Sequence, residues 1–222
     1  MSLNPSKAVI FDLDGVLVDT GKFHQQSWED LAGRQGWAFS EEIFRQTFGM
    51  QNYQIIPILA GGDLPPAEVN RLADWKEARY RELVAGRLSL LEGAAALIND
   101  LKKHKFLLAI GTSTPRENLD FILNQIPIRD DFDALVSGEE VSNGKPAPDT
   151  FLKAAEKLRV PAGRCGVVED AVQGVQAARA AGMKVIAVAT TRRRQDLIQA
   201  DFIVDSLGEL SADRFDQLLG TG

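Results

Sequence analysis

Two aspartates, Asp12 and Asp14, stand directly after the apolar run Val9–Phe11 and just before Gly15. Residues two apart in a strand point to the same side, so both carboxylates are expected to project together where the strand ends. Neighbouring carboxylates repel each other unless a positive charge lies between them. A hard cation such as Mg²⁺, which takes oxygen ligands, would supply that charge. The alternative is an Asp-Gly turn without a catalytic role.

Two hydroxyl residues, Thr112 and Ser113, follow a second apolar run, Phe106–Ile110. Thr114 and Glu117 match the N-cap and N3 positions of a capping box, which predicts a helix beginning here. The free N–H groups and the dipole of a helix N-terminus favour an anion. Thr112 and Ser113 would then bind a phosphate, although an ordinary loop explains them equally well.

One lysine, Lys145, lies between Gly144 and Pro146 in a loop that follows the apolar run 132–136. Most lysines are solvated surface residues. A lysine held at the carboxyl end of a strand could instead neutralise both a carboxylate and a phosphate oxygen. Lys145 is therefore a candidate for phosphate binding and for catalysis.

A second acidic pair, Glu169 and Asp170, ends the apolar run Cys165–Val168. Asp170 is a good helix N-cap residue, which would explain it without any further role. Adjacent acids at the end of a buried strand nevertheless need compensation, and a metal ion shared with Asp12 and Asp14 would provide it.

Together these residues could perform phosphoryl transfer. Asp12 would attack phosphorus and form an aspartyl-phosphate. Asp14 would protonate the leaving oxygen and later deprotonate the attacking water. Mg²⁺ and Lys145 would offset the charge of a phosphate that approaches a carboxylate.

Alternating short strands and helices are predicted to position these residues. From Leu88 onward, hydrophobic periodicity predicts such alternation, which indicates a doubly wound, Rossmann-like parallel sheet in an α/β fold. Ligands of such sheets bind beyond the carboxyl ends of the strands. The predicted strands cover 106–110, 132–136, 165–168, 185–188 and 202–204, and the predicted helices cover 93–103, 115–124, 148–158, 171–181 and a last segment that ends at 219.

The segment between Thr20 and Gly86 shows helical spacing only, with Gly33 and Gly36 expected to end its first helix. We therefore expect an inserted all-helical cap domain at 19–88, and a core domain formed by 1–18 and 89–222. Glycines near both crossings could act as hinges that let the cap close over a substrate.

The composition of the 222 residues, 45% hydrophobic and 25% charged, fits a soluble globular protein. No apolar run suggests a membrane span, and Met1–Lys7 lacks the apolar segment of a signal peptide. The single cysteine, Cys165, excludes an internal disulfide and is expected to be a buried thiol. The net charge of −6 argues against nucleic acid as the main partner. We expect a cytoplasmic monomer.

These motifs resemble those of the haloacid dehalogenase superfamily, in its branch with a helical cap inserted after the first motif. The resemblance covers nearly the whole chain and implies a Mg²⁺-dependent phosphatase or phosphomutase. The four matching motifs are Asp12-Leu13-Asp14-Gly15, Thr112, Lys145-Pro146 and Glu169-Asp170.

The resemblance also implies a set of metal ligands. Asp12 and Asp170 would bind Mg²⁺ through their side chains, Asp14 through its backbone carbonyl, and Glu169 directly or through water. True dehalogenases lack an acid at the position of Asp14, so its presence favours phosphate chemistry.

Within the superfamily, the cap is similar to that of the β-phosphoglucomutase-like proteins. Thr20, His24, Gly49 and Lys76 match positions of that subgroup. His24 would either lie near Asp14 or only pack within the cap.

Two positions depart from the subgroup. Phe48 and Asn52 stand where the mutases carry a lysine and an arginine that hold the distal phosphate of a bisphosphate. Lys76 or Arg116 could reach that phosphate from another direction. His104 and the run Arg192–Arg194 are most simply exposed, and contact of the arginines with an anionic substrate is the alternative.

The leading hypothesis is a phosphatase that acts on a small phosphorylated metabolite, with sugar phosphates as candidates. A β-phosphoglucomutase-type hexose phosphomutase is the alternative enzyme. A catalytically silent binding protein is the alternative from another class, and the complete set of Asp12, Asp14, Lys145 and Asp170 argues against it.

Overall fold

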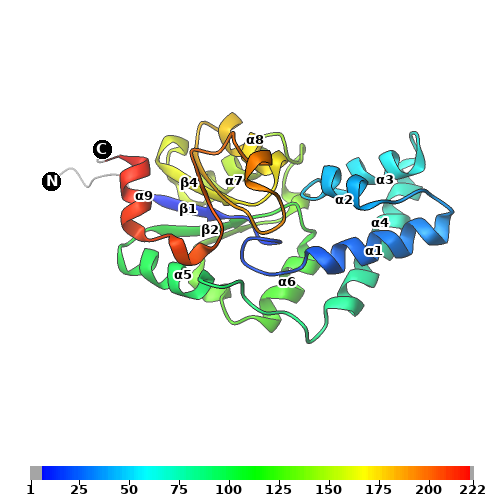
Figure 1. The fold of residues 1–222 in the computed structure, drawn as a ribbon, viewed down its shortest axis with the longest axis horizontal. Helices are drawn as coiled ribbons and strands as arrows, with labels where there is room; N and C mark the ends of the chain where they lie inside the picture. Colours follow the sequence, from blue (N-terminus) through cyan, green and yellow to red (C-terminus); the bar gives the residue numbers. More distant parts are fainter. Residues whose placement is uncertain (1–6, 221–222) are drawn as a thin grey trace.

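The computed structural model describes residues 7–220 and shows a parallel β-sheet between two layers of helices, with further helices attached at one end (Figure 1). Over that range the chain forms six strands in the order β3-β2-β1-β4-β5-β6, and every neighbouring pair is parallel. The predicted α/β fold is confirmed. The strands are β1 (Ala8–Phe11), β2 (Leu107–Gly111), β3 (Ala134–Val136), β4 (Cys165–Glu169), β5 (Lys184–Val188) and β6 (Phe202–Val204).

Helices cover both faces of this sheet (Figure 1). One face packs against α5 (Ala94–Lys103), α6 (Arg116–Gln125) and α9 (Ala212–Leu219). The opposite face packs against α7 (Asp149–Leu158) and α8 (Val172–Ala180). Each strand is therefore buried on both sides, which explains why the strands read as nearly continuous apolar runs.

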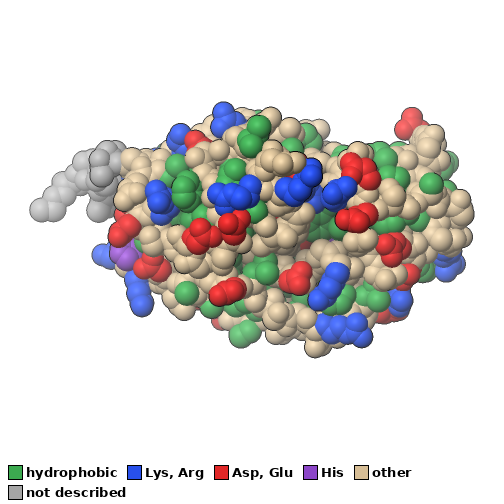
Figure 2. Space-filling model, viewed as in Figure 1, with side chains coloured by type: hydrophobic (Ala, Val, Ile, Leu, Met, Phe, Trp, Pro, Cys, Tyr) green, Lys and Arg blue, Asp and Glu red, His purple; other side chains and the backbone are tan. Residues whose placement is uncertain are grey.

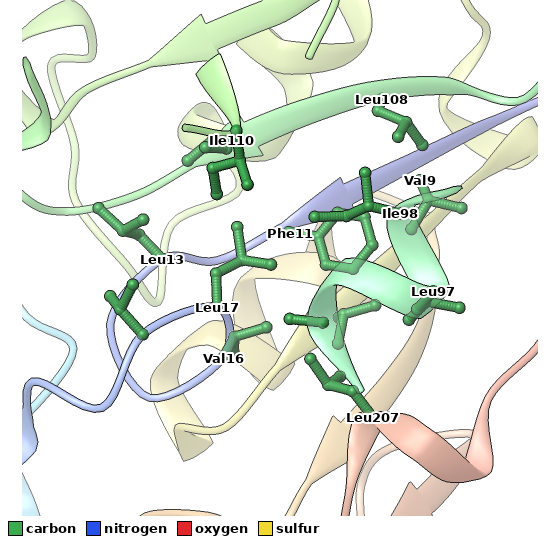
Figure 3. Packing of buried hydrophobic residues seen from close by; sticks show 14 of the residues in the cluster. Val9, Phe11, Leu13, Val16, Leu17, Leu97, Ile98, Leu108, Ile110 and Leu207 are labelled. Carbon is green, nitrogen blue, oxygen red and sulfur yellow. The ribbon is translucent and has the colours of Figure 1, made fainter. Parts of the chain in front are cut away.

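The central strand β1 shows how the sequence produces this layering. Val9 and Phe11 point into the core on one face, while Ala8 and Ile10 point into the core on the other. Figure 3 shows Phe11 packed near Ile98, among side chains from several elements. Burial of a side chain of this size stabilises the fold by roughly 1.5–3 kcal/mol.

The position of β1 also determines where a ligand can bind. β1 lies between β2 and β4, and the chain order reverses at this point of the sheet. The crevice beyond the carboxyl ends of the strands at such a reversal is where open α/β sheets bind ligands.

The first four helices after β1 form a helical cap, as expected, with a hydrophobic cluster of its own. Its helices are α1 (Gly21–Gln35), α2 (Glu41–Thr47), α3 (Asn52–Ala60) and α4 (Pro66–Val84). The two crossings between cap and core pair with each other: Val18 bridges to Leu90, and Leu91 N donates to Leu17 O at 2.9 Å.

Helix α2 was not predicted. Its start carries a recognisable signal, because the Ser40 hydroxyl accepts a hydrogen bond from Ile43 N at 3.2 Å and two glutamates occupy the first turn. The prediction that Gly33 ends α1 was wrong. The helix continues to Gln35 and ends at Gly36, which adopts φ 71°.

Other expectations concern the ends and the surface of the chain. Cys165 is buried, and burial raises the pKa of its thiol to about 12, as a structural thiol requires. None of the helices between residues 7 and 220 has the length and apolar character needed to cross a membrane. Residues 1–6, where we expected no signal peptide, lie outside the described range.

Candidate active site

Three carboxylates and one ammonium group meet at the carboxyl ends of β1 and β4. Lys145 Nζ donates to Asp12 Oδ1 at 2.7 Å and to Glu169 Oε1 at 2.6 Å. Oxygen atoms of Asp12, Glu169 and Asp170 lie within 4.8 Å of one another, and all three residues are buried. One lysine therefore faces three acids in an environment that water does not screen.

The excess of negative charge is visible in the pKa values. Burial raises the pKa of Asp12 to about 7, because the opposing attraction of Lys145 is not sufficient and Glu169 and Asp14 add repulsion. Burial, with repulsion from Glu169 and Asp12, also raises the pKa of Asp170 well above its ordinary value. The pKa of Lys145 is raised, since its two carboxylate partners outweigh its burial.

This cluster has the properties of a divalent cation site. Its candidate ligand atoms are all oxygens, which suits Mg²⁺. Asp170 Oδ1 is buried and has no hydrogen-bond partner within the part of the chain that the structure describes. Thr191 donates to the other oxygen, Oδ2, so Oδ1 is the atom left for an ion.

Two glycines make room for these carboxylates. Gly15 has φ 81°, and a Cβ on it would lie 2.2 Å from Asp170 Oδ2. A Cβ on Gly174 would lie 1.7 Å from Glu169 Oε1. Glu169 Oε2 accepts from the backbone N–H groups of Asp170 and Ala171, at 2.7 and 2.8 Å. The cluster is therefore held by the local backbone as well as by Lys145.

Asp14 takes different partners from Asp12. Its Oδ1 accepts from Thr20 Oγ1 at 2.5 Å and lies 3.2 Å from His24 Nε2, while its Oδ2 accepts from Thr114 Oγ1. Burial alone would raise the pKa of Asp14, but His24 and the hydroxyls of Thr114 and Thr20 outweigh it and lower the pKa to about 2. Asp14 is therefore a firmly held carboxylate.

Asp12 and Asp14 both reach the space beyond the end of β1, but they take different partners there. Both residues line the same chamber, but only Asp12 joins the cluster of three carboxylates.

The predicted capping box at Thr114 and Glu117 was wrong. Helix α6 is preceded by Pro115, and no side chain caps it there. The Thr114 hydroxyl donates to Asp14 instead, and the Glu117 carboxylate lies 3.1 Å from Arg81 NH1 on the cap.

The loop after β2 contributes the two predicted hydroxyl residues to the chamber. Thr112 Oγ1 accepts from Thr114 N at 3.1 Å, and Ser113 Oγ donates to Gly49 O at 2.8 Å. The first N–H group of α6, on Arg116, already donates to Glu139 Oε2 at 3.0 Å. Thr112 Oγ1 donates to no acceptor among residues 7–220, so its proton is available to a phosphate, whereas Ser113 Oγ would first have to release Gly49 O.

The cap closes the other side of the chamber. Lys76 Nζ lies 3.0 Å from His24 Nδ1 and donates to Glu77 Oε1 at 2.9 Å. The two ring nitrogens of His24 thus face different partners, Nδ1 the Lys76 ammonium group and Nε2 the Asp14 carboxylate at 3.2 Å. The ring of His24 stacks on Tyr80 with a centroid distance of 4.0 Å. A polar chain thus links the cap lysine to Asp14.

Glu77 was missed by the sequence analysis, although it is central to the cap side of the chamber. Its buried carboxylate accepts from Asn52 Nδ2 at 2.8 Å and from Asn118 Nδ2 at 2.6 Å, in addition to Lys76. Burial opposes ionisation, but Lys76 and the other donors outweigh it and lower the pKa of Glu77. No signal in the local sequence distinguishes Glu77 from an exposed glutamate, because adjacent residues of a helix do not face each other.

Two arginines lie elsewhere than expected. The guanidinium group of Arg116 is exposed and pairs with Asp120 at 2.9 Å, outside the chamber. The prediction that Arg192 is exposed was wrong: it is buried, donates to Arg45 O and lies 5.7 Å from the ring centroid of Phe48. The carbonyl groups at the end of α2 lack partners within their helix, and Arg192 satisfies one of them.

Two neighbouring cavities lie between the cap and the core at this site. The chamber that contains Asp12 and Asp14 holds about 50 Å³ and is lined by both the core and the cap, including Phe48, Gly49 and Lys76. Beside it lies a groove of about 520 Å³ between α3, α4 and the loops after β2 and β3. His24, Gly49, Asn52 and Lys76 line the chamber, and Thr20 donates to Asp14.

The chain is similar to known proteins over most of its length. The chain is 33% identical to Protein CbbY of Rhodobacter capsulatus, over 96% of this chain and 98% of that protein. It is 30% identical to the fructose-1-phosphate phosphatase YqaB of Escherichia coli (strain K12), over 81% of this chain and 95% of that protein.

Solved structures show the same architecture. The crystal structure of β-phosphoglucomutase from Clostridium difficile superposes with a TM-score of 0.88 at 26% identity, over 96% of this chain and 97% of that one. The model of the haloacid dehalogenase-like hydrolases matches residues 6–182. With the phosphatase among its relatives, this match supports hydrolysis of phosphoric monoesters: the chain belongs to the haloacid dehalogenase-like hydrolase family.

Proposed function

We propose that this protein is a Mg²⁺-dependent phosphatase that hydrolyses a small phosphorylated metabolite, with sugar phosphates as candidates. One observation carries the proposal: Asp12 lies in a small chamber, beside Lys145 and the other two buried carboxylates, with Asp14 in the same chamber. Nucleophile, charge compensation and proton carrier are thus in one place.

Asp12 is proposed as the nucleophile. Its Oδ1 is bound by Lys145, while Oδ2 accepts no hydrogen bond from residues 7–220 and is free to attack phosphorus. A bond forms between Oδ2 and phosphorus as the bond to the ester oxygen breaks. Water then attacks phosphorus and releases inorganic phosphate and the Asp12 carboxylate.

Asp14 is proposed to carry the protons. Its ionised state suits the second step, in which it takes a proton from the attacking water. The first step requires a protonated Asp14 that donates to the leaving oxygen. We therefore expect the bound substrate to displace one of the three donors that now hold this carboxylate.

The oxygen cluster fits Mg²⁺, which Asp12 and Asp170 would bind through their side chains and Asp14 through its backbone carbonyl. Both oxygens of Glu169 already accept hydrogen bonds, which favours a contact through water over a direct one. The ion would supply positive charge that draws electron density from the phosphoryl oxygens. Thr112, Ser113 and Lys145 are proposed to hold the remaining phosphoryl oxygens.

We also propose that residues 19–88 move as a unit against 1–18 and 89–222. Support comes from the separate hydrophobic cluster of the cap and from the short paired crossings at Val18 and Leu90. We propose further that the protein acts as a monomer.

The proposal is tested by release of nitrophenol from p-nitrophenyl phosphate with Mg²⁺ or with a chelator. We expect metal-dependent turnover that Asp12→Asn abolishes while the circular dichroism spectrum is unchanged. Asp63→Asn, in the exposed turn between α3 and α4, is the matched control and should retain full activity. Folded wild-type protein that releases no nitrophenol would support the silent binding protein instead.

A further inference from the structure

The groove beside the chamber is large enough for the part of a substrate that the chamber cannot hold. The chamber has room for little more than a phosphoryl group, at about 50 Å³, while the groove offers about 520 Å³, within the range of small-molecule sites. Asn52, Glu77, Ser113 and Pro115 line both spaces, so the two lie directly beside each other.

The charged groups around the groove are mostly acidic. Four acids line it against a single basic residue, Arg81. That arginine is already engaged, because its NH1 lies 3.1 Å from Glu117 Oε2 and donates to Asn118 Oδ1 at 2.6 Å. The acids are Asp74, Glu77, Glu117 and Glu139.

Two of these acids have no cationic partner. Glu77 is compensated by Lys76, and Glu117 by Arg81. Asp74 and Glu139 are exposed and form no ion pair with any residue from 7 to 220. Glu139 accepts from Arg116 N, and the charge of the Arg116 guanidinium offsets part of its own. The charge of Asp74 and the remaining charge of Glu139 act on whatever enters the groove, and they oppose an anion there.

The uncharged groups of the groove indicate what it accepts. Asn52, Asn70 and Tyr53 offer amide and hydroxyl groups, while Val69 and Val141 offer apolar contact. These groups suit a body with hydroxyl or amino substituents, because each such substituent can exchange hydrogen bonds with amides and carboxylates.

We propose that the groove holds the non-phosphate part of the substrate, and that this part carries hydroxyl or amino groups and no second acidic group. The inference rests on the proposed function, because the phosphoryl group must occupy the chamber. Asp74 and Glu139 are then specificity-determining residues that exclude bisphosphates and phosphorylated acids by charge.

A series of ligands on one six-carbon scaffold tests this selection by charge. Glucosamine 6-phosphate carries an ammonium group, glucose 6-phosphate is neutral apart from its phosphate, 6-phosphogluconate adds a carboxylate, and glucose 1,6-bisphosphate adds a phosphate. Binding is measured by calorimetry with Mg²⁺ and Asp12→Asn, so that no ligand is consumed. We expect affinity to fall along this series, by about tenfold or more from the neutral ligand to the bisphosphate.

Charge-reversing variants show whether Asp74 and Glu139 cause this dependence of affinity on ligand charge. Asp74→Lys and Glu139→Lys should each reduce the ratio between the highest and the lowest affinity of the series by several-fold. Added salt should reduce this ratio as well. Asp63→Lys makes an identical charge change on the cap away from the groove, and should leave the series unchanged. Equal affinities, tightest binding of the bisphosphate, or no binding of any member would overturn the inference.

The two proposals can fail separately. Wild-type turnover of p-nitrophenyl phosphate is measured beside the binding series, and its absence would refute the phosphatase proposal alone. The order of the four affinities tests whether the groove selects ligands by charge, whether or not the wild type turns over p-nitrophenyl phosphate.

Discussion

Lys145 Nζ lies 2.7 Å from Asp12 Oδ1, although 133 positions separate the two residues in the chain. The same ammonium group donates to Glu169 at 2.6 Å, and all three side chains are buried. Lys145 thus holds together two strand ends that would otherwise repel each other.

Replacement of this lysine should therefore destabilise the metal-free protein. We expect Lys145→Met to lower the free energy of unfolding by about 3–5 kcal/mol, because it leaves buried carboxylates without their counter-charge. Urea unfolding in the presence of a chelator measures the loss. Mg²⁺ should restore part of the stability but not the turnover.

The control for this variant is Lys153→Met. Lys153 lies on α7, is exposed and pairs only with Glu156. Its replacement should change the free energy of unfolding by about 0.5 kcal/mol or less. If both variants lost the same free energy of unfolding, the buried ion pair between Lys145 and Asp12 would stabilise the fold no more than an exposed pair does.

The meeting of Asp12, Lys145 and Asp170 could be predicted from the sequence, because each follows a predicted strand and parallel strands bring their carboxyl ends to one edge. The partners of Asp14 could not be predicted in this way. Thr114 reaches Asp14 only because the loop after β2 turns before α6 begins.

The cap was predictable only in outline. Helical spacing identified it, but the orientation of its helices on the core depends on packing between distant residues. The buried positions of Glu77 and Arg192 follow from that packing, and nothing in their local sequence distinguishes them from exposed charges.

Stability of the metal-free protein should depend on pH with a definite sign. The pKa of Asp12 is raised from 3.8 to about 7, so the folded state holds a proton that the unfolded state has lost. Stability therefore falls as the pH rises from 3.8 to about 7. Asp170 acts in the same direction. Folding lowers the pKa of Asp14 from 3.8 to about 2. Asp14 therefore stabilises the fold above about pH 4, and this contribution is lost as the pH falls from about 4 to about 2.

Mg²⁺ should offset this loss, and more strongly at high pH. At a concentration about 100 times its Kd, the ion should stabilise the fold by about 2.7 kcal/mol, a rise in Tm of roughly 5–10 °C. Thermal unfolding with Mg²⁺ or chelator, at about pH 5.5 and about pH 8, measures the difference. An equal rise at both values would contradict the assignment of Asp12 and Asp170 as ligands.

Thr114→Val should change the titration of Asp14. The substitution removes a hydroxyl donor to a buried carboxylate, a bond worth about 1.5–3 kcal/mol. The pKa of Asp14 should rise by roughly one to two units, and the acidic limb of the profile of kcat/KM against pH should move upward.

Thr150→Val is the matched control for this variant. Thr150 is also buried, but its hydroxyl has no hydrogen-bond partner among residues 7–220, so the substitution removes no bond. Its pH profile should coincide with that of the wild type. If Thr114→Val also left the acidic limb in place, Asp14 would not be the group that titrates there.

Arg192→Ala should weaken the contact between cap and core. Arg192 donates to Arg45 O, and Gln173 Nε2 donates to Gln46 O at 2.6 Å, so two core side chains bind the end of α2. Figure 2 shows basic side chains gathered on the face where α2 meets the loop after β5. We expect KM to rise by about tenfold, as for the loss of one charged hydrogen bond.

Small-angle scattering gives an independent readout of this contact. When vanadate and Mg²⁺ are added, the radius of gyration of the wild type should decrease, and that of Arg192→Ala should decrease by a smaller amount. Arg193→Ala is the control, since Arg193 is exposed and pairs with Asp196 at 3.0 Å. Identical profiles for all three proteins, with and without vanadate, would argue against closure of the cap.

Hydrolysis should outrun mutase chemistry. A mutase must retain a bisphosphate intermediate while it turns over in the site, and the second phosphate then needs a cationic partner in the cap. Asn52 carries no charge and donates to Glu77, and Phe48 can donate nothing. The ammonium group of Lys76 is paired with Glu77, and Arg116 is paired with Asp120 outside the chamber.

Each missing charged contact should cost about 1.5–3 kcal/mol, enough to weaken bisphosphate binding by roughly tenfold or more. The measurement supplies β-glucose 1-phosphate with a trace of the bisphosphate and Mg²⁺, and follows glucose 6-phosphate and inorganic phosphate together. We expect phosphate to appear faster. If glucose 6-phosphate forms many times faster than phosphate, the retained intermediate must be held by a group other than those at positions 48 and 52, and the mutase function replaces the phosphatase function.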